Sequence, residues 1–149
     1  MSTILFYRER DQPYGCFSNF SRHPFTLQGH EWPTVEHFFQ AQKFPGTEQY
    51  GRILHAVSPK EAKVLGNSRE FPMRPDWDLV KDQIMFDAVY QKFATHEDIR
   101  AILLGTGSDL IEEAAYNDSY WGTGADGNGR NQLGITLVAV REELRLKNK

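Results

Sequence analysis

Helix start and stop signals follow one another along most of this 149-residue chain, and they constrain its fold more than any other feature. Ser58-Pro59-Lys60-Glu61 is a capping box with proline at the first helical position, and Gly66 is placed to end the helix that it opens. A second helix is expected over Thr34–Phe44, with Thr34 as its cap and Pro45-Gly46 as its stop. These signals predict that the first half of the chain is largely helical.

The second half carries the same kind of signal. Asp76 is placed to cap a helix, and Thr95–Asp98 opens another that runs through Leu104. Apolar residues at helical spacing support the first of these helices and predict a terminal one; they are Val80, Ile84, Val89 and Phe93, and then Leu133, Leu137, Val140 and Leu144.

Strand signals are confined to the N-terminal part of the chain. Thr3–Tyr7 is expected to be a strand, and Phe25–Trp32 a hairpin that turns at Gly29. With 40% hydrophobic and 25% charged residues, a chain of this length suits one compact core. We expect a mainly α (α+β) fold, a compact multihelical single domain over residues 1–149 with a small β element near the N-terminus.

Charge and composition argue against several classes of protein. The formal net charge of −3 disfavours a protein that coats nucleic acid through bulk electrostatics, although a local patch for a DNA substrate stays open. Cys16 is the single cysteine, so no internal disulfide requires an oxidising compartment. No stretch approaches the ~18 apolar residues of a membrane span, and no basic segment precedes the short apolar run at the N-terminus. We expect a cytoplasmic protein without a membrane partner.

The segment Pro33–Lys43 concentrates polar and aromatic side chains. On a helical wheel Glu36, Gln40 and Lys43 share one narrow stripe beside the apolar face. Glu36 and Lys43 are about 10 Å apart along the helix axis, which is too far for an intrahelical ion pair. The stripe is either a solvated helix face or the wall of a site. Its setting among proline, tryptophan and phenylalanine favours a site, because an unpaired carboxylate is costly to bury.

The segment Asn117–Asn131 is a glycine-rich loop. Gly122–Gly127 has the G-x-G-x-x-G spacing of a dinucleotide fingerprint, but no apolar strand precedes it, so that interpretation fails. Its glycines would instead let backbone amides approach a ligand, with Asp118 and Trp121 at the entrance. The alternative is a glycine-rich surface connection.

Four segments resemble, in order and spacing, the motifs of the NADAR (YbiA-like) family, and the match extends from about Phe6 to Leu144. They are Tyr14–Phe20, Trp32–Phe44, Asp76–Lys81 and Asn117–Gly124. The resemblance implies N-glycosidase chemistry, which is the hydrolysis of a bond between ribose C1 and a nitrogen. Some members of the family remove ADP-ribose from guanine bases, and others act on phosphorylated ribosylamino-pyrimidine intermediates of riboflavin synthesis. The resemblance also implies that Glu36, Trp77 and Asp118 form the site.

Cleavage of a ribosyl C–N bond develops positive charge on the sugar and negative charge on the departing base. Such a reaction needs a carboxylate near C1 and a donor near the base. Of Glu36 and Asp118, one would stabilise the sugar or activate water, and the other would hold ribose hydroxyls or act as a general acid. Lys43 either supplies a fixed positive charge for a phosphate or leaving group, which we favour, or attacks C1 and forms a Schiff base.

Aromatic and polar residues complete the predicted site. Trp77 and Trp121 offer stacking faces for a base, worth about 1–3 kcal/mol each, whereas Trp32 is expected in the core. The residues expected to contact substrate are Arg8, Asn19, Phe20, Gln40, Trp121, Gly122 and Gly124. The expected substrate is a small-molecule or nucleic-acid-linked ADP-ribose or ribosyl compound.

No metal and no cofactor are expected. The five histidines form no H-x-H or H-x-x-x-H pair, and His37 is interpreted as a packing or hydrogen-bonding residue. Two functions stay open, a metal-independent N-glycosyl hydrolase and a non-catalytic ADP-ribose-binding module. The carboxylate pair favours the enzyme. We favour ADP-ribosyl-guanine over a riboflavin intermediate as the expected substrate, because this chain has no fused riboflavin-pathway domain.

Overall fold

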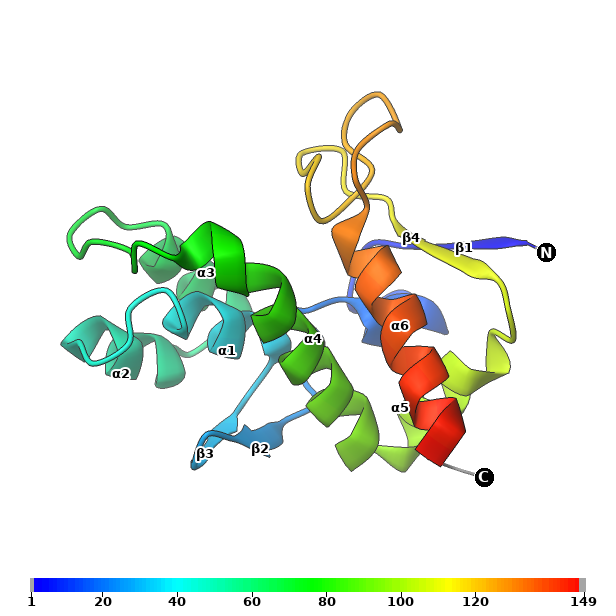
Figure 1. Cartoon of the computed structure of the whole chain (residues 1–149), viewed down its shortest axis with the longest axis horizontal. Helices are drawn as coiled ribbons and strands as arrows, with labels where there is room; N and C mark the ends of the chain where they lie inside the picture. Colours follow the sequence, from blue (N-terminus) through cyan, green and yellow to red (C-terminus); the bar gives the residue numbers. More distant parts are fainter. Residues whose placement is uncertain (1, 148–149) are drawn as a thin grey trace.

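The computed structural model describes residues 2–147, which fold mainly into helices around one hydrophobic core (Figure 1). The elements in chain order are β1 (Thr3–Phe6), the 3-10 helix η1 (Tyr14–Phe17), β2 (Phe25–Leu27), β3 (His30–Trp32), α1 (Val35–Ala41), α2 (Glu48–Leu54), α3 (Pro59–Gly66), α4 (Trp77–Thr95), α5 (Glu97–Gly105), β4 (Leu110–Glu113) and α6 (Gln132–Lys147). Figure 1 places α1, α2 and α3 at one end and β1, β4, α5 and α6 at the other, with α4 in contact with both groups. The prediction of a mainly α (α+β) fold is confirmed.

The β structure consists of two small sheets. β2 and β3 form the predicted hairpin, in which Gln28 and Gly29 take positive φ angles of 56° and 79°, as a tight two-residue turn requires. β1 pairs in parallel with β4, with Thr3 opposite Leu110 and Phe6 opposite Glu113. The sequence analysis does not predict β4, because its partner strand lies at the opposite end of the chain.

Two predicted helix caps in the first half of the chain are confirmed. Thr34 Oγ1 accepts a hydrogen bond from the His37 amide at 3.1 Å and caps α1. Ser58 Oγ accepts one from the Glu61 amide at 3.1 Å, and Pro59 is the first residue of α3. These side chains satisfy amides that have no partner inside the helix, so they fix where each helix begins.

Two details of the helix prediction are wrong. α1 ends at Ala41 rather than Phe44, because the amides of Lys43 and Phe44 bond carbonyls three residues back and tighten the chain into a turn. Asp76 directly precedes α4, but its carboxylate does not cap the helix. It instead accepts a hydrogen bond from Arg74 Nε at 2.6 Å. The carboxylate therefore pairs with the neighbouring guanidinium and not with the first amides of the helix.

The core lies where α4 packs against both α1 and α6. The apolar stripe predicted for the terminal helix is buried at all of its positions, Leu133, Leu137, Val140 and Leu144. Trp32 is fully buried, as predicted for a core residue, and its Nε1 donates to the Leu27 carbonyl at 2.9 Å. Within residues 2–147 the helices are too short or too polar to cross a membrane.

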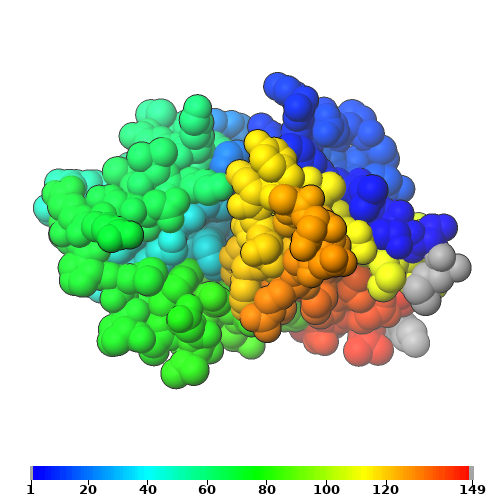
Figure 2. Space-filling view, turned by 90° about the horizontal axis from the view of Figure 1, so that it is seen from above, coloured from blue at the N-terminus to red at the C-terminus, as the bar shows by residue number. Residues whose placement is uncertain are grey.

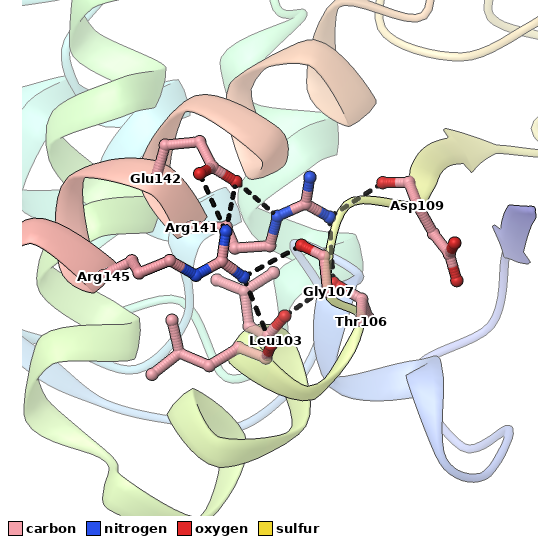
Figure 3. Close-up of polar contacts among 8 residues, drawn as sticks. Leu103, Thr106, Gly107, Asp109, Arg141, Glu142 and Arg145 are labelled. Carbon is pink, nitrogen blue, oxygen red and sulfur yellow. Dashed lines mark hydrogen bonds and ion pairs between the residues drawn. The ribbon is translucent and has the colours of Figure 1, made fainter. Parts of the chain in front are cut away.

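A buried arginine joins α6 to the end of α5 (Figure 3). Arg141 is 3% exposed, and its Nη1 donates to Thr106 Oγ1 at 2.9 Å and to the Asp109 carbonyl at 2.8 Å. Its Nε donates to Glu142 at 2.9 Å, and Glu142 also accepts hydrogen bonds from Arg145. The cluster holds the turn that leads into β4, and the end of β4 forms part of the site described next.

Candidate active site

One cavity of about 340 Å³ brings together distant parts of the chain: α1, the first half of α4, the end of β4 and the loop after β4. The predicted site residues that line it are Asn19, Phe20, Glu36, Gln40, Lys43, Trp77, Asp118 and Trp121. In Figure 2 the loop after β4, in yellow and orange, covers the middle of the molecule, and atoms of the α1 region, in cyan, show between it and the green helices.

Helix α1 presents its polar stripe to the cavity. Glu36 is 7% exposed, and its Oε2 accepts a hydrogen bond from Gln40 Nε2 at 2.7 Å. Burial raises the pKa of Glu36, while the Gln40 hydrogen bond and the charges of Lys63 and Lys43 oppose that shift. Helix α3 passes so close that a Cβ at Gly66 would overlap the Gln40 side chain. The glycine at the end of α3 thus makes room for the amide that holds Glu36.

Lys43 lies in the turn after α1, at the wall of the cavity. Its Nζ donates to the Gly66 carbonyl and to Asn67 Oδ1, both at 3.4 Å, and lies 5.9 Å from the centre of the Trp77 ring. Burial lowers the pKa of Lys43, and the nearby Glu36 carboxylate opposes the shift. This geometry is compatible with both predicted roles, the fixed charge and the Schiff-base amine.

Asp118 organises the loop after β4. Its Oδ1 accepts hydrogen bonds from the amides of Tyr120 at 3.0 Å and Trp121 at 2.9 Å, which closes a tight turn. The Tyr120 hydroxyl donates to Asp82 Oδ1 at 2.6 Å and ties the loop to α4. One carboxylate oxygen of Asp118 therefore orients Trp121, which leaves the second for a ligand.

The two predicted stacking residues are held by a third aromatic ring. The Phe39 ring meets Trp77 at a centroid distance of 5.0 Å and an angle of 60°. It meets Trp121 at 5.3 Å and 87°. These edge-to-face contacts fix both indoles at the cavity wall, so neither ring has to be ordered when a ligand binds.

Two residues that line the cavity each have a buried amide oxygen without a hydrogen-bond partner within residues 2–147, Asn19 Oδ1 and Gln40 Oε1. An unpaired buried acceptor costs about 1–3 kcal/mol. Both amides are nevertheless oriented by their nitrogens, since Asn19 Nδ2 contacts the Met85 sulfur at 3.6 Å and Gln40 Nε2 donates to Glu36. Both oxygens are covered by the protein itself, and Gln40 Oε1 lies against Gly66 of α3, so they belong to the wall behind the cavity.

The glycines of the loop serve a different purpose from the predicted one. Gly122 and Gly124 do not line the cavity, and the Gly124 amide already donates to the Ala115 carbonyl at 3.2 Å. A Cβ at Gly122 would lie 2.9 Å from both Ala115 Cβ and the Glu113 carbonyl oxygen. These glycines allow the loop backbone to lie against the segment that follows β4, rather than against a ligand.

Arg8 also lies outside this cavity. It is exposed and, with Arg10, lines an adjoining cavity of about 510 Å³. The residues that line both cavities are Ser18, Phe20, Lys63, Glu113 and Asp118. The two cavities are therefore contiguous. A ligand long enough to extend from the first cavity into the second would reach Arg8.

Several residues that line the cavity are not among those predicted from the sequence. They are Ser18, Phe39, Lys63, Asn67, Lys81, Met85, Glu113 and Tyr120. Glu113 matters most because it adds a third carboxyl group. The pKa of Glu113 is raised to about 7. Its burial is the largest cause, and the nearby carboxylates of Asp118 and Glu36 add to it. The sequence does show an acidic pair at the end of Leu110–Glu113. It indicates a site residue only once the structure places the end of β4 beside the cavity.

His37 makes hydrogen bonds and is not part of a metal site among the described residues. His37 is buried, with Nδ1 2.8 Å from Thr34 Oγ1 and Nε2 3.0 Å from the Ala56 carbonyl oxygen, which confirms its predicted hydrogen-bonding role. Within residues 2–147 no group of three or more His, Cys, Asp or Glu side chains is arranged to hold a metal ion. Metal independence stays a prediction.

Buried carboxyl groups and oriented aromatic rings in one cavity define a site of the kind found in enzymes that act on polar ring-bearing substrates. A model of the NADAR domain matches residues 5–145. The chain belongs to the NADAR family, as the sequence motifs predict.

Individual relatives agree with this assignment. N-glycosidase Npun_R5314 of Nostoc punctiforme is 53% identical over 146 residues, which cover 96% of this chain and 93% of that protein. N-glycosidase YbiA of Escherichia coli (strain K12) is 41% identical over 145 residues, 97% of this chain and 91% of that protein. The NMR structure of the E. coli protein YbiA matches with a TM-score of 0.91 and 41% identity, and covers 99% of this chain and 87% of that chain. The protein is an N-glycosyl hydrolase, and the prediction of an enzyme is confirmed.

A further relative carries a different description. Riboflavin biosynthesis protein PYRR, chloroplastic, of Zea mays is 37% identical over 156 residues, which cover 95% of this chain and 25% of that protein. This chain therefore corresponds to one part of that larger protein.

Proposed function

We propose that the protein hydrolyses the bond between ribose C1 and a base nitrogen in a phosphorylated ribosyl N-glycoside, with ADP-ribosyl-guanine as the first candidate substrate. The observation that carries the proposal is the common cavity of Glu36, Asp118, Trp77 and Lys43. Cleavage of this bond needs a carboxylate beside the cationic sugar. Glu36 offers one in a buried setting, where its charge acts more strongly than in water.

Each polar group of the cavity has a part in this reaction. Glu36 stabilises the oxocarbenium-like sugar and accepts a proton from the attacking water. The second oxygen of Asp118 accepts a hydrogen bond from a ribose hydroxyl. Gln40 holds the Glu36 carboxylate through its Nε2 donor, and Asn19 contributes its side chain to the cavity wall. Lys43 supplies positive charge near the departing base or a phosphate.

The extent of the cavities favours a long substrate. The main cavity continues into the adjoining one, where the guanidinium groups of Arg8 and Arg10 suit the phosphates of an ADP-ribosyl group. A ribosyl monophosphate would leave much of the second cavity unused. The same basic residues provide the local patch through which a guanine carried by DNA would be accepted.

A second candidate substrate is a phosphorylated ribosylamino-pyrimidine. It is supported by relatives named as riboflavin biosynthesis proteins, at 37% identity in Zea mays and 35% in Vibrio vulnificus, over nearly all of this chain. Both candidates share a phosphorylated ribose bonded through C1 to the nitrogen of a heterocycle. They differ in what lies beyond the first phosphate.

Product analysis by mass spectrometry tests the proposal. The protein would be incubated with ADP-ribosylated guanosine nucleotide, with a DNA oligonucleotide carrying ADP-ribosyl-guanine, and with the ribosylamino-pyrimidine phosphate. We expect free ADP-ribose and the unmodified guanine compound, with a higher kcat/KM than for the pyrimidine. Faster cleavage of the pyrimidine would transfer the assignment to the second candidate. Cleavage of none of the three would contradict the proposed function.

A further inference from the structure

We propose that Glu113 is the general acid of this hydrolysis, holding a proton in the free enzyme and giving it to the base nitrogen as the C1–N bond breaks. The inference rests on the proposed function and adds a third carboxyl group to Glu36 and Asp118. Its test includes a readout that does not depend on turnover, so the two proposals can fail separately.

The backbone around Glu113 is firmly held. The Glu113 amide donates to Asn131 Oδ1 at 2.9 Å, and its carbonyl oxygen accepts a hydrogen bond from the Thr123 amide at 2.9 Å. Asn131 Nδ2 in turn donates to the Ile111 carbonyl at 2.8 Å, so the end of β4 is braced on both sides. Strand alternation puts Ile111 and Glu113 on one face and Glu112 on the other. A change of the Glu113 side chain leaves these backbone bonds intact.

The surroundings of the Glu113 carboxyl favour its neutral form. Within residues 2–147 the hydrogen bonds of Glu113 are made by its backbone, and no N–H group donates to its carboxyl group. The carboxylates of Asp118 and Glu36 are its acidic neighbours, and Lys63 is the basic group that opposes them. Burial is the largest cause that disfavours ionisation of Glu113, and the two nearby negative charges act in the same direction. Together they raise the pKa of Glu113 to about 7.

Glu36 differs from Glu113 in its hydrogen-bond partner. It accepts the Gln40 hydrogen bond at 2.7 Å, and Lys63 and Lys43 add positive charge beside it. Burial is the larger effect and, with the Asp118 carboxylate, raises the pKa of Glu36, whereas these contacts favour its ionised form. The Gln40 donor thus marks Glu36, rather than Glu113, as the carboxyl group whose ionised form a hydrogen bond stabilises, which is the difference expected between a base and an acid in one cavity.

The position of Glu113 suits proton donation. It lines the main cavity and the adjoining one, so a substrate that extends across both passes this carboxyl. Water attacks C1 and gives a proton to Glu36, while the electron pair of the C1–N bond goes to the base nitrogen. That nitrogen takes the proton of Glu113, and the products are a C1 hydroxyl and a neutral base. Exchange with solvent then moves the proton from Glu36 and restores it on Glu113.

The leaving group provides the first test. Glu113→Gln should lower kcat on the N-glycoside by about 10²–10³-fold, because the base then leaves without a proton. 4-Nitrophenyl ribofuranoside 5-phosphate, whose leaving group needs no proton, should be cleaved within about threefold of the parent rate. Glu112→Gln, one position away on the opposite face of β4, is the matched control and should retain both activities. Equal losses on the two substrates in Glu113→Gln would overturn the role of acid.

The pH dependence provides the second test. For the parent, kcat/KM on the N-glycoside should fall as the pH rises through about 7, since the acid must be protonated to act. The fall should be absent for the nitrophenyl substrate and absent in Glu113→Gln. A variant that keeps the same fall would show that another group causes it.

Urea unfolding tests the held proton without any substrate. The folded pKa of Glu113 lies above the unfolded value, so its contribution to stability is lost as the pH rises through about 7. Glutamine does not titrate, and the variant should therefore gain stability relative to the parent between about pH 5 and about pH 8. If the parent cleaves no N-glycoside, the proposed function fails, while this measurement still decides whether Glu113 holds a proton. A stability difference that is the same at both pH values would overturn the inference.

Discussion

Two buried polar clusters within residues 2–147, one around Arg141 and one around the cavity, differ in how completely their groups are paired. Around Arg141 the guanidinium donates to three oxygens within 2.9 Å, and the cluster joins α5, α6 and the turn before β4 (Figure 3). Around the cavity, Asn19 Oδ1 and Gln40 Oε1 have no partner among residues 2–147, and three carboxyl residues line the same space. The paired buried charge of Arg141 stabilises the fold. The unpaired polar groups around the cavity cost stability and indicate a ligand-binding site.

The largest effect on the fold is expected from the paired cluster. Arg141→Met should lower the free energy of unfolding by about 3 kcal/mol, because it leaves the Asp109 carbonyl without its donor and removes a buried charge from its partners. Turnover per folded molecule should be unchanged, since the cluster does not reach the cavity. Urea unfolding and turnover measured on the same sample check both statements.

The matched control is Arg52→Met, at an arginine whose side chain is 46% exposed and pairs with Glu48 on the surface. It should change stability by less than about 1 kcal/mol. If Arg141→Met cost no more than this control, the distinction between the two clusters would not hold.

A smaller effect is expected at Lys43, where the roles of charge and nucleophile can be separated. Lys43→Arg keeps the positive charge but alters its geometry beside Gly66 and Asn67, so activity should fall about tenfold rather than vanish. Borohydride added during turnover of the parent should trap no covalent adduct. An adduct that maps to Lys43, together with complete inactivity of the variant, would make the amine the nucleophile.

The smallest effect concerns Lys92, a buried cation whose Nζ donates to the Ser18 carbonyl at 3.0 Å. Burial lowers the pKa of Lys92 to about 7 from its ordinary 10.5. Between these values the unfolded chain binds more protons, so this residue should make stability rise with pH. Lys92→Met should reduce that slope in urea unfolding above about pH 7. An identical slope in parent and variant would mean that Lys92 keeps its charge in the fold.

The parts of the fold that the sequence predicted are those with local causes. The caps at Thr34 and Ser58 lie next to the amides that they satisfy, so their helices could be located directly. Helix α2 (Glu48–Leu54) begins at Thr47 without a side-chain cap, and no motif marks it. Strand β4 depends on pairing with β1 at the other end of the chain, which no local pattern records.

The site shows the same division. Motifs predicted Glu36, Trp77 and Asp118 as the site, and the structure brings them to one cavity. The significance of Glu113 comes from carboxylates that are distant in sequence, so spacing alone could not indicate it. The glycine-rich loop misled the prediction because glycine permits close approach of the backbone without specifying what approaches, and at Gly122 the neighbour is the protein itself.

The most direct test of the comparison is Glu36→Gln, with stability and turnover measured on one preparation. Because the change removes a buried charge, we predict that the free energy of unfolding equals or exceeds that of the parent, while kcat falls by about 10²–10³-fold or more. Glu31→Gln, at an exposed glutamate outside the cavity, should change neither quantity. Turnover of Glu36→Gln within about threefold of the parent would contradict the claim that this buried carboxylate is kept for catalysis rather than for the fold.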